Sequence, residues 1–174
     1  MGLETFAEHV RLGGTDRFVL WQSAFEFDVP ERLVRDESGR IIAFSTLEAA
    51  SAYTTSRQLA FSGYPHGGDP THDLDAAAAW AARPTADTLD HALVRKTWRF
   101  LAAAALLPGM YDERLDPRLE QVVWQLDSAE LAAIDPKSAH LAPRWTEDEL
   151  VVLANTMLRG VDEFAALLTL PVAV

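Results

Sequence analysis

Residues 36–53, DESGRIIAFSTLEAASAY, decide the fold class. An acidic turn ends at Gly39, and the apolar run Arg40–Phe44 (RIIAF) then predicts a short strand. Ser45 and Glu48 follow at the spacing of a capping box, in which each side chain accepts a hydrogen bond from a backbone amide at the start of a helix. The stretch therefore predicts a strand that leads directly into a helix.

The sequence before this stretch predicts a partner for the strand. Asp16–Asp28 (DRFVLWQSAFEFD) is rich in aromatic and β-branched residues. Pro30 ends this run, so we expect it to pair with Arg40–Phe44 as a hairpin with a wide loop. Together with the helix, the two strands make a ββα unit. The inward face of the helix is predicted to hold Leu47, Ala50, Tyr53 and Thr54.

The pattern changes on either side of this unit. Residues 1–13 contain three apolar residues at helical spacing and predict a brief lead-in helix that ends at Gly13-Gly14. Residues 63–73 (GYPHGGDPTHD) are dominated by glycine, proline, aspartate and histidine. This composition predicts an irregular loop and a seam between two lobes.

The segments after residue 73 predict helices. Leu74–Ala82 is rich in alanine, and Thr85 is expected to cap a long helix that Pro108-Gly109 ends. Asp116-Pro117 is a cap followed by proline at the first helical position, which predicts the start of another helix. Ser128 is expected to begin a separate short turn.

The last predicted helix begins at a second capping box, formed by Thr146 and Glu149. Apolar residues follow the box at helical spacing, and they are interpreted as core: Leu150, Leu153, Met157, Val161, Phe164 and Leu168. The whole pattern predicts an α+β, predominantly helical fold, with an N-terminal β-hairpin plus helix followed by a helical, bundle-like lobe. The length of 174 residues favours a single domain, 1–174, with lobes at 1–62 and 74–174.

The charge balance narrows the classes of function. With 26 acidic and 15 basic side chains the chain has a formal net charge of −11, which argues against nucleic-acid binding because that requires a basic face. Residues 61–174 hold 17 acidic and 9 basic side chains, so an electronegative surface is expected mostly on the helical lobe. A basic protein partner fits this charge, since complementary fields steer association.

Cysteine usage and hydropathy bear on location. The chain has no cysteine, which fits a reducing compartment. The N-terminal sequence MGLETFAEHVRLGG has neither the basic leader nor the apolar core of a signal peptide. The longest apolar run, Phe100–Pro108, is too short to span a bilayer. We therefore expect a cytoplasmic protein that does not enter the membrane.

Four residues of the 63–73 loop are candidate metal ligands: His66, Asp69, His72 and Asp73. Their spacing matches no established metal signature. The chain also lacks a nucleophile elbow and a glycine-rich phosphate loop. We expect no cofactor, no catalytic residues and no enzymatic activity. A small metal-binding or ligand-binding enzyme or sensor that uses this loop is the alternative.

Acidic residues beside aromatic ones are candidates for contact with a protein partner. Several of them come before or open predicted helices, where the helix dipole already favours negative charge. Beside exposed aromatic rings, such carboxylates can also occupy the basic surface of another protein. The candidates are Tyr111, Asp112, Glu113, Asp116, Trp145, Glu147 and Asp148. Most of the five tryptophans are expected in the core, with one or two as interface anchors.

Asp36–Tyr53 resembles segments of the small acidic immunity proteins of bacterial polymorphic toxin and contact-dependent inhibition systems. The likeness lies in the order of acidic turn, glycine, apolar strand, aromatic residue, capping box and alanine-rich helix, and it covers about a tenth of the chain. The resemblance implies a protein that binds one cognate toxin in the cytoplasm of the producing cell. It also implies that the protein blocks the toxin's active site or assembly and has no catalytic residues of its own.

Charge, motif content and resemblance together predict a cytoplasmic inhibitory protein, an immunity protein or antitoxin that covers the basic surface of a cognate toxin. A helical adaptor or dimerisation module is a further alternative, built on the amphipathic helix Glu147–Leu168. The identity of the partner and the oligomeric state stay open.

Overall fold

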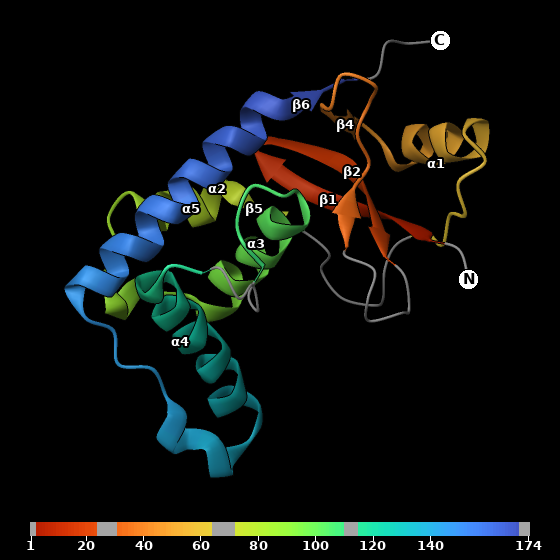
Figure 1. The fold of residues 1–174 in the computed structure, drawn as a ribbon. Coiled ribbons are helices and arrows are strands. Elements are labelled where there is room, and N and C mark those ends of the chain that lie inside the picture. Colours follow the sequence, from red (N-terminus) through yellow and green to blue (C-terminus); the bar gives the residue numbers. More distant parts are fainter. Residues whose placement is uncertain (1–2, 24–30, 64–71, 110–114, 171–174) are drawn as a thin grey trace. The chain divides into compact units, whose positions relative to one another are not determined.

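The computed structural model describes residues 3–23, 31–63, 72–109 and 115–170. Strands dominate the first part of the chain and helices the second, so the predicted α+β class is confirmed (Figure 1). The elements in chain order are β1 (Glu4–Leu12), β2 (Thr15–Ser23), β3 (Arg32–Leu33), β4 (Ile41–Phe44), α1 (Leu47–Ser56), β5 (His72–Asp73), α2 (Leu74–Ala81), the 3-10 turn η1 (Ala86–Thr88), α3 (His91–Ala103), α4 (Pro117–Ile134), the 3-10 turn η2 (Pro136–Leu141), α5 (Glu147–Leu167) and β6 (Leu168–Thr169).

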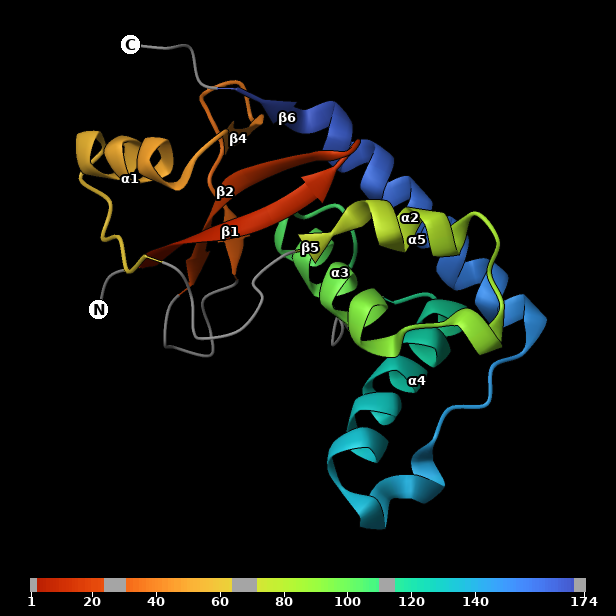
Figure 2. The same cartoon turned by 180° about the vertical axis from the view of Figure 1, so that it is seen from behind.

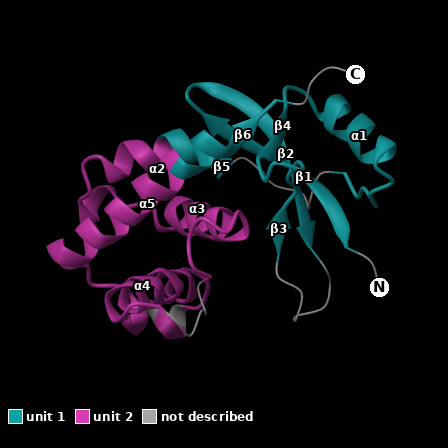
Figure 3. Cartoon of the chain, turned by 45° about the horizontal axis from the view of Figure 1, so that its top comes forward, with its two compact units in different colours: residues 1–75, 163–174 teal, residues 76–162 magenta. Residues whose placement is uncertain are grey.

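The chain forms two compact units (Figure 3). Residues 1–75 and 163–174 make the first unit, and residues 76–162 make the second. The end of the chain belongs to the first unit because β6 pairs in parallel with β4, with Ile41 opposite Leu168. The predicted lobes, which divide the chain only at the 63–73 loop, do not include this pairing of the C-terminal strand with the first unit.

β1 replaces the lead-in helix predicted for residues 1–13, so that prediction is wrong. β1 and β2 form an antiparallel hairpin from the Glu4–Ser23 pair to the Leu12–Thr15 pair. Gly13 and Gly14 make the two-residue turn, and both have positive φ (60° and 67°), as a type I′ turn requires. The signal for the hairpin was this Gly-Gly pair between two segments that can pair along their whole length.

The sheet has the order β5-β1-β2-β4-β6, with β3 also paired to β2. The predicted antiparallel pairing of the two apolar runs is confirmed, since Phe18 lies opposite Phe44 in β2 and β4. β3 pairs antiparallel with β2 as well, with Leu33 opposite Trp21. Between β3 and β4 the Asp36 carboxylate accepts hydrogen bonds from Ser38 N, Ser38 Oγ and Arg40 N, which closes a tight loop.

α1 packs on one face of the sheet (Figure 2). Its inward residues are those predicted: Ala50 and Thr54 are buried, and Leu47 and Tyr53 pack at the edge of the same core. The predicted capping box is wrong by one residue, because Thr46 is the N-cap and its Oγ1 accepts a hydrogen bond from Ala49 N. Ala49 has no carboxylate to return the bond, so a single cap replaces the box.

The core between α1 and the sheet joins residues from four elements. Its buried members are Ala7 of β1, Leu20 of β2, Ile42 and Phe44 of β4, and Ala50 of α1. Phe44 and Tyr53 meet with their ring centroids 5.3 Å apart, and the Arg57 guanidinium lies 5.6 Å above the Tyr53 ring. Burial of these apolar side chains is the main term that holds α1 on the sheet.

The second unit contains most of α2, all of α3 and α4, and most of α5 (Figure 3). α3 begins at His91, later than predicted, because Thr85 opens only the turn η1 and Asp90 caps the helix by accepting from Leu93 N. α4 does not stop at Ser128, which is buried within the helix. Ser128 lies on the buried side of α4 with Leu126 and Ala129, and burial of this side outweighs the modest helix propensity of serine.

Two of the predicted helix starts are confirmed. Asp116 caps α4 by accepting from Arg118 N over 2.9 Å, with Pro117 at the first helical position. Thr146 and Glu149 form the predicted capping box at α5: Glu149 N donates to Thr146 Oγ1, and Thr146 N donates to the Glu149 carboxylate. The predicted apolar stripe is buried at Leu150, Leu153, Met157, Val161 and Phe164, while Leu168 lies in β6.

Among the residues that the structure describes, no helix combines the length and apolar character needed to cross a bilayer.

Candidate protein-binding surface

The structure separates the four candidate metal ligands. His66 and Asp69 lie outside the described residues, whereas His72 and Asp73 form β5 beside β1. His72 is buried and its Nε2 lies 3.1 Å from the Glu8 carboxylate, with its ring stacked on Trp21 at 6° between planes. In the described part of the chain, no group of three or more His, Cys, Asp or Glu side chains could hold a metal ion.

Asp73 lies in a second polar group at the same end of the sheet. Arg11 is 3.8 Å from the Asp73 carboxylate and 2.9 Å from that of Asp16. The hydrogen bond from Arg11 and its positive charge lower the pKa of the Asp16 carboxyl. These pairs join β1, β2 and β5, so the described polar contacts of Arg11, Asp16 and Asp73 have a structural explanation.

A shallow pocket with a volume of about 460 Å³ lies beside α1. It is open to solvent and has a single carboxylate among its lining residues, so it lacks the enclosure and the converging polar groups that hold a small ligand. The lining residues are Leu47, Glu48, Ser51, Ala52, Thr55 and Phe61.

The proposed partner-contact residues are distributed over the second unit. Tyr111, Asp112 and Glu113 lie outside the described residues. Asp116, Glu147 and Asp148 are exposed, and each lies at the start of a helix. Negative charge is favourable at a helix start, so this exposure by itself does not identify a binding site.

Trp145 is less available than expected. The side chain is half-buried, and its Nε1–H donates a hydrogen bond to His91 Nε2 over 2.9 Å. Partial burial lowers the pKa of His91, so the imidazole is held in the neutral form that can accept this bond. Trp145 therefore joins α3 to the start of α5 within the second unit.

The most exposed tryptophan is Trp124 on α4. Its side chain is 55% exposed, and two further large apolar residues of the same helix, Leu131 and Ile134, are 47% and 71% exposed. Trp21, Trp80 and Trp98 are buried, as expected of core residues. Isolated exposed apolar residues are common in soluble proteins, but α4 alone carries three of the five large apolar side chains that are exposed in the described part of the chain.

These residues lie on one face of α4. Counting from Glu120, the intervals of four, three, four and three residues lead through Trp124, Asp127, Leu131 and Ile134. This is the spacing at which one helix packs along another. We call these five residues the outer face of α4; at about 1.5 Å per residue it is about 21 Å long.

The opposite side of α4 is buried within the second unit. It contains Val122, Val123, Gln125, Leu126, Ser128 and Ala129. The helix packs on α3 and on η2, and the Gln125 side chain accepts a hydrogen bond from Arg144 N. α4 therefore has two apolar sides, whereas a surface helix ordinarily has one apolar and one polar side.

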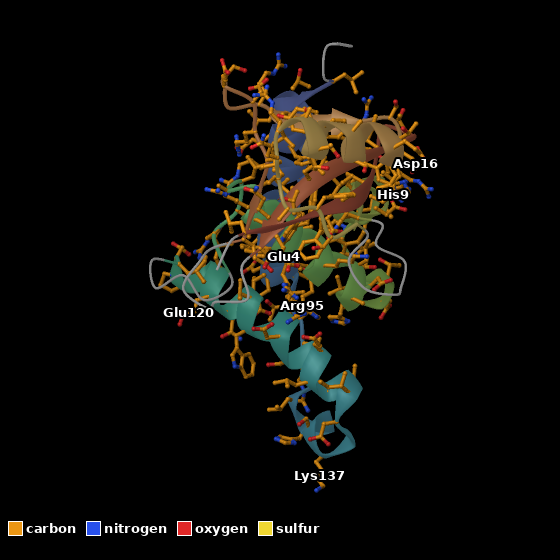
Figure 4. The ribbon with its side chains drawn as sticks, turned by 90° about the vertical axis from the view of Figure 1, so that its right-hand side faces the viewer. Glu4, His9, Asp16, Arg95, Glu120 and Lys137 are labelled. Carbon is orange, nitrogen blue, oxygen red and sulfur yellow. The ribbon has the colours of Figure 1, made fainter. Side chains whose placement is uncertain are left out.

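The outer face is bordered by acidic side chains. From Asp116 to Ile134 the sequence holds four acidic residues and one basic residue. Arg95 of α3 contacts Asp127 Oδ1 over 3.1 Å and Glu130 Oε2 over 2.6 Å. One guanidinium thus faces two carboxylates, and Glu120 adds a third carboxylate in the N-terminal half of α4. Figure 4 labels Glu120 near the start of α4 and Arg95 apart from it, further along the helix.

The sequence pattern does not predict Leu131 and Ile134 as part of this face, because it predicts a separate turn from Ser128. The prediction that most of the acidic excess lies on the helical lobe does not hold for the two units: the first unit holds 13 acidic and 6 basic residues, and the second holds 13 acidic and 9 basic residues. The larger net charge, −7, therefore belongs to the first unit and −4 to the second. The sequence feature that could have identified the outer face is the spacing of seven and three residues between Trp124, Leu131 and Ile134, which places them on one side of a helix.

Comparison of the chain with protein-family models, with curated proteins and with solved structures gives no match.

Proposed function

We propose that this chain is a protein-binding inhibitor, an immunity protein that neutralises a cognate bacterial toxin in the cytoplasm by covering a basic surface of the toxin. The observation that carries the proposal is the outer face of α4, which presents Trp124 and two large aliphatic side chains to solvent among carboxylates. Tryptophan is enriched among the residues that dominate binding energy, and acidic neighbours select a basic partner.

The overall charge supports the same partner class. At a formal net charge of −11 the chain attracts a basic protein over distances of about a Debye length, which is about 8 Å at physiological ionic strength. This attraction raises the rate of association more than it raises the final affinity. A complex formed in this way therefore associates more slowly as salt is added.

The resemblance of residues 36–53 to immunity proteins adds the biological setting. This segment forms β4, α1 and the loop before them, and it supplies part of the core of the first unit. This segment therefore contributes to the folded core, whereas the outer face of α4 is the proposed contact with the toxin.

The adaptor alternative is less well supported. It used the apolar stripe of Glu147–Leu168 as a contact for a second protein, but Leu153, Met157 and Phe164 of that stripe are buried within the chain itself. A dimer through this stripe would have to open the chain's own core, at the cost of several buried side chains.

Coexpression with the protein encoded next to this chain in its native host tests the proposal. We expect a stoichiometric complex with a basic protein and an association rate that falls as salt is raised from about 50 to about 500 mM. Expression of the neighbouring protein alone should harm the cells, and coexpression of this chain should rescue them. If the neighbour is harmless, or no stoichiometric complex forms at low salt, the proposed function is wrong.

A further inference from the structure

We propose that the outer face of α4 is a docking surface for a basic amphipathic helix of the partner. The proposal rests on the proposed function for its biological meaning, but its physical basis is independent. The face has the four-three spacing of a helix-packing seam, and it holds apolar residues at three of five positions.

The apolar part of the face sets the affinity. Trp124 is the largest side chain on it, and Leu131 and Ile134 continue the same side of the helix for nearly three further turns. A second helix that lies along this seam covers all three at once, because side chains at these intervals pack into the spaces between those of the facing helix.

The charged part of the face sets the identity of the occupant. Glu120 and Asp127 lie within the seam and Glu130 lies beside it. Arg95 pairs with Asp127 and with Glu130, so the three carboxylates and this guanidinium together carry a formal charge of −2. Lysine or arginine residues that flank the apolar stripe of the incoming helix would meet these carboxylates. An acidic helix of the same apolar pattern would meet like charges and would be rejected.

A second copy of this chain is a poorer occupant, although Trp124 could meet Leu131 in an antiparallel pair. In that pair the centre of the seam places Asp127 opposite Asp127 of the other copy. Each copy also carries a net charge of −11. Like charges that face each other across an interface oppose its formation, so the charge of the face favours a basic partner over self-association.

A peptide titration tests this surface directly. The probe is a synthetic peptide of 18 residues with leucines on one helical face and lysines on both sides of it. One comparison peptide replaces every lysine by glutamate, and another has the composition of the probe in scrambled order. Binding is followed by NMR on isotopically labelled protein, with the indole N–H signal of Trp124 as one reporter and the amides of α4 as others.

We expect the lysine peptide to shift the signals of Trp124 and of the α4 amides, and the other two peptides to leave them unchanged. Trp124→Ala and Leu131→Ala are each expected to weaken binding of the lysine peptide about tenfold or more, as substitutions of anchor residues do. Glu120→Lys is also expected to weaken this binding, because it replaces an attractive charge by one that repels the lysines of the peptide. Val151→Ala is the matched control, since Val151 is 50% exposed on α5 of the same unit and lies off the proposed surface.

Several results would overturn the proposal: no shift on α4 at millimolar peptide, equal binding of the scrambled or glutamate peptide, or equal losses for the control variant. A dimer detected by light scattering that Trp124→Arg dissociates would replace it with self-association. If the toxin complex forms but tolerates Trp124→Arg and Leu131→Arg, the surface is wrong and the function stands. If the peptide binds as expected and the neighbouring protein does not, the function is wrong and the surface stands.

Discussion

The indole of Trp145 is bonded to the imidazole of His91. Trp145 Nε1–H donates to His91 Nε2 over 2.9 Å, and the two rings stack with centroids 6.0 Å apart. His91 is the first residue of α3, and Trp145 directly precedes the capping box of α5. The bond exists only while Nε2 carries no proton, because a protonated imidazole has no acceptor. Partial burial, opposed by the negative charge of Asp90, lowers the pKa of His91 and preserves that acceptor.

This lowered pKa predicts a loss of stability in mild acid. The folded pKa lies below the unfolded value of about 6.5, so the unfolded state binds more protons between the two. The contribution is fully present above pH 6.5 or so and is lost as the pH falls through the folded pKa. We expect His91→Gln, which does not titrate, to lose less unfolding free energy between pH 7 and pH 5, as measured by urea denaturation. Equal losses in both proteins would show that His91 is not the responsible group.

The β1–β2 turn predicts a large effect from a small substitution. Gly14 has φ near 67°, a conformation that costs an L-residue about 1–2 kcal/mol. Its amide, like that of Gly13, donates to the Asp75 carboxylate, over 2.8 and 2.7 Å respectively. Gly14→Ala should therefore lower the free energy of unfolding by about that amount. Gly109→Ala is the control, since Gly109 lies outside the left-handed region and has open space around its Cβ position, and it should cost little.

The caps of α1 and α5 give a paired test of the helix starts. Removing the Thr46 hydroxyl by Thr46→Ala should cost about 1 kcal/mol of unfolding free energy, because Ala49 N loses its acceptor. Thr146→Ala should cost a similar amount at α5. Ser45→Ala should be close to neutral, since Thr46 holds the cap position. Thermal denaturation of the three variants is the measurement, and a larger loss for Ser45→Ala than for Thr46→Ala would contradict the observed cap.

Gly160 of α5 is a site of close packing. A Cβ atom there would lie 2.9 Å from Leu101 Cδ1 and 3.2 Å from Leu107 Cδ2. Alanine improves helix propensity by about 1 kcal/mol, but overpacking of a filled core costs about 1–3 kcal/mol. Leu101 is fully buried, and the added Cβ would also lie 3.2–3.3 Å from Leu107, so we expect Gly160→Ala to be destabilising by chemical denaturation. Asn155→Ala, at an exposed position of the same helix, should be neutral or stabilising.

Local sequence patterns predicted correctly those features of the fold that depend on interactions between residues close together in the sequence. The cap at Asp116, the box at Thr146 and Glu149, and the apolar stripe of α5 follow from hydrogen bonds and periodicity within a few turns. The pairing of the two apolar runs also follows from their composition. The fold class was predictable because such signals dominate the chain, but helix starts at Thr85 and Ser45 were displaced by competing caps one to five residues further along.

By itself, the sequence determined the elements whose stability comes from neighbouring residues, namely the apolar strands, most of the helices and their caps. Only the tertiary structure decided which apolar residues are covered. Leu131 and Ile134 are residue types that usually lie in a core, yet they are exposed because α4 buries its other side. Periodicity identifies an apolar face, whereas burial depends on contacts from distant segments, and α4 has more apolar surface than those contacts cover.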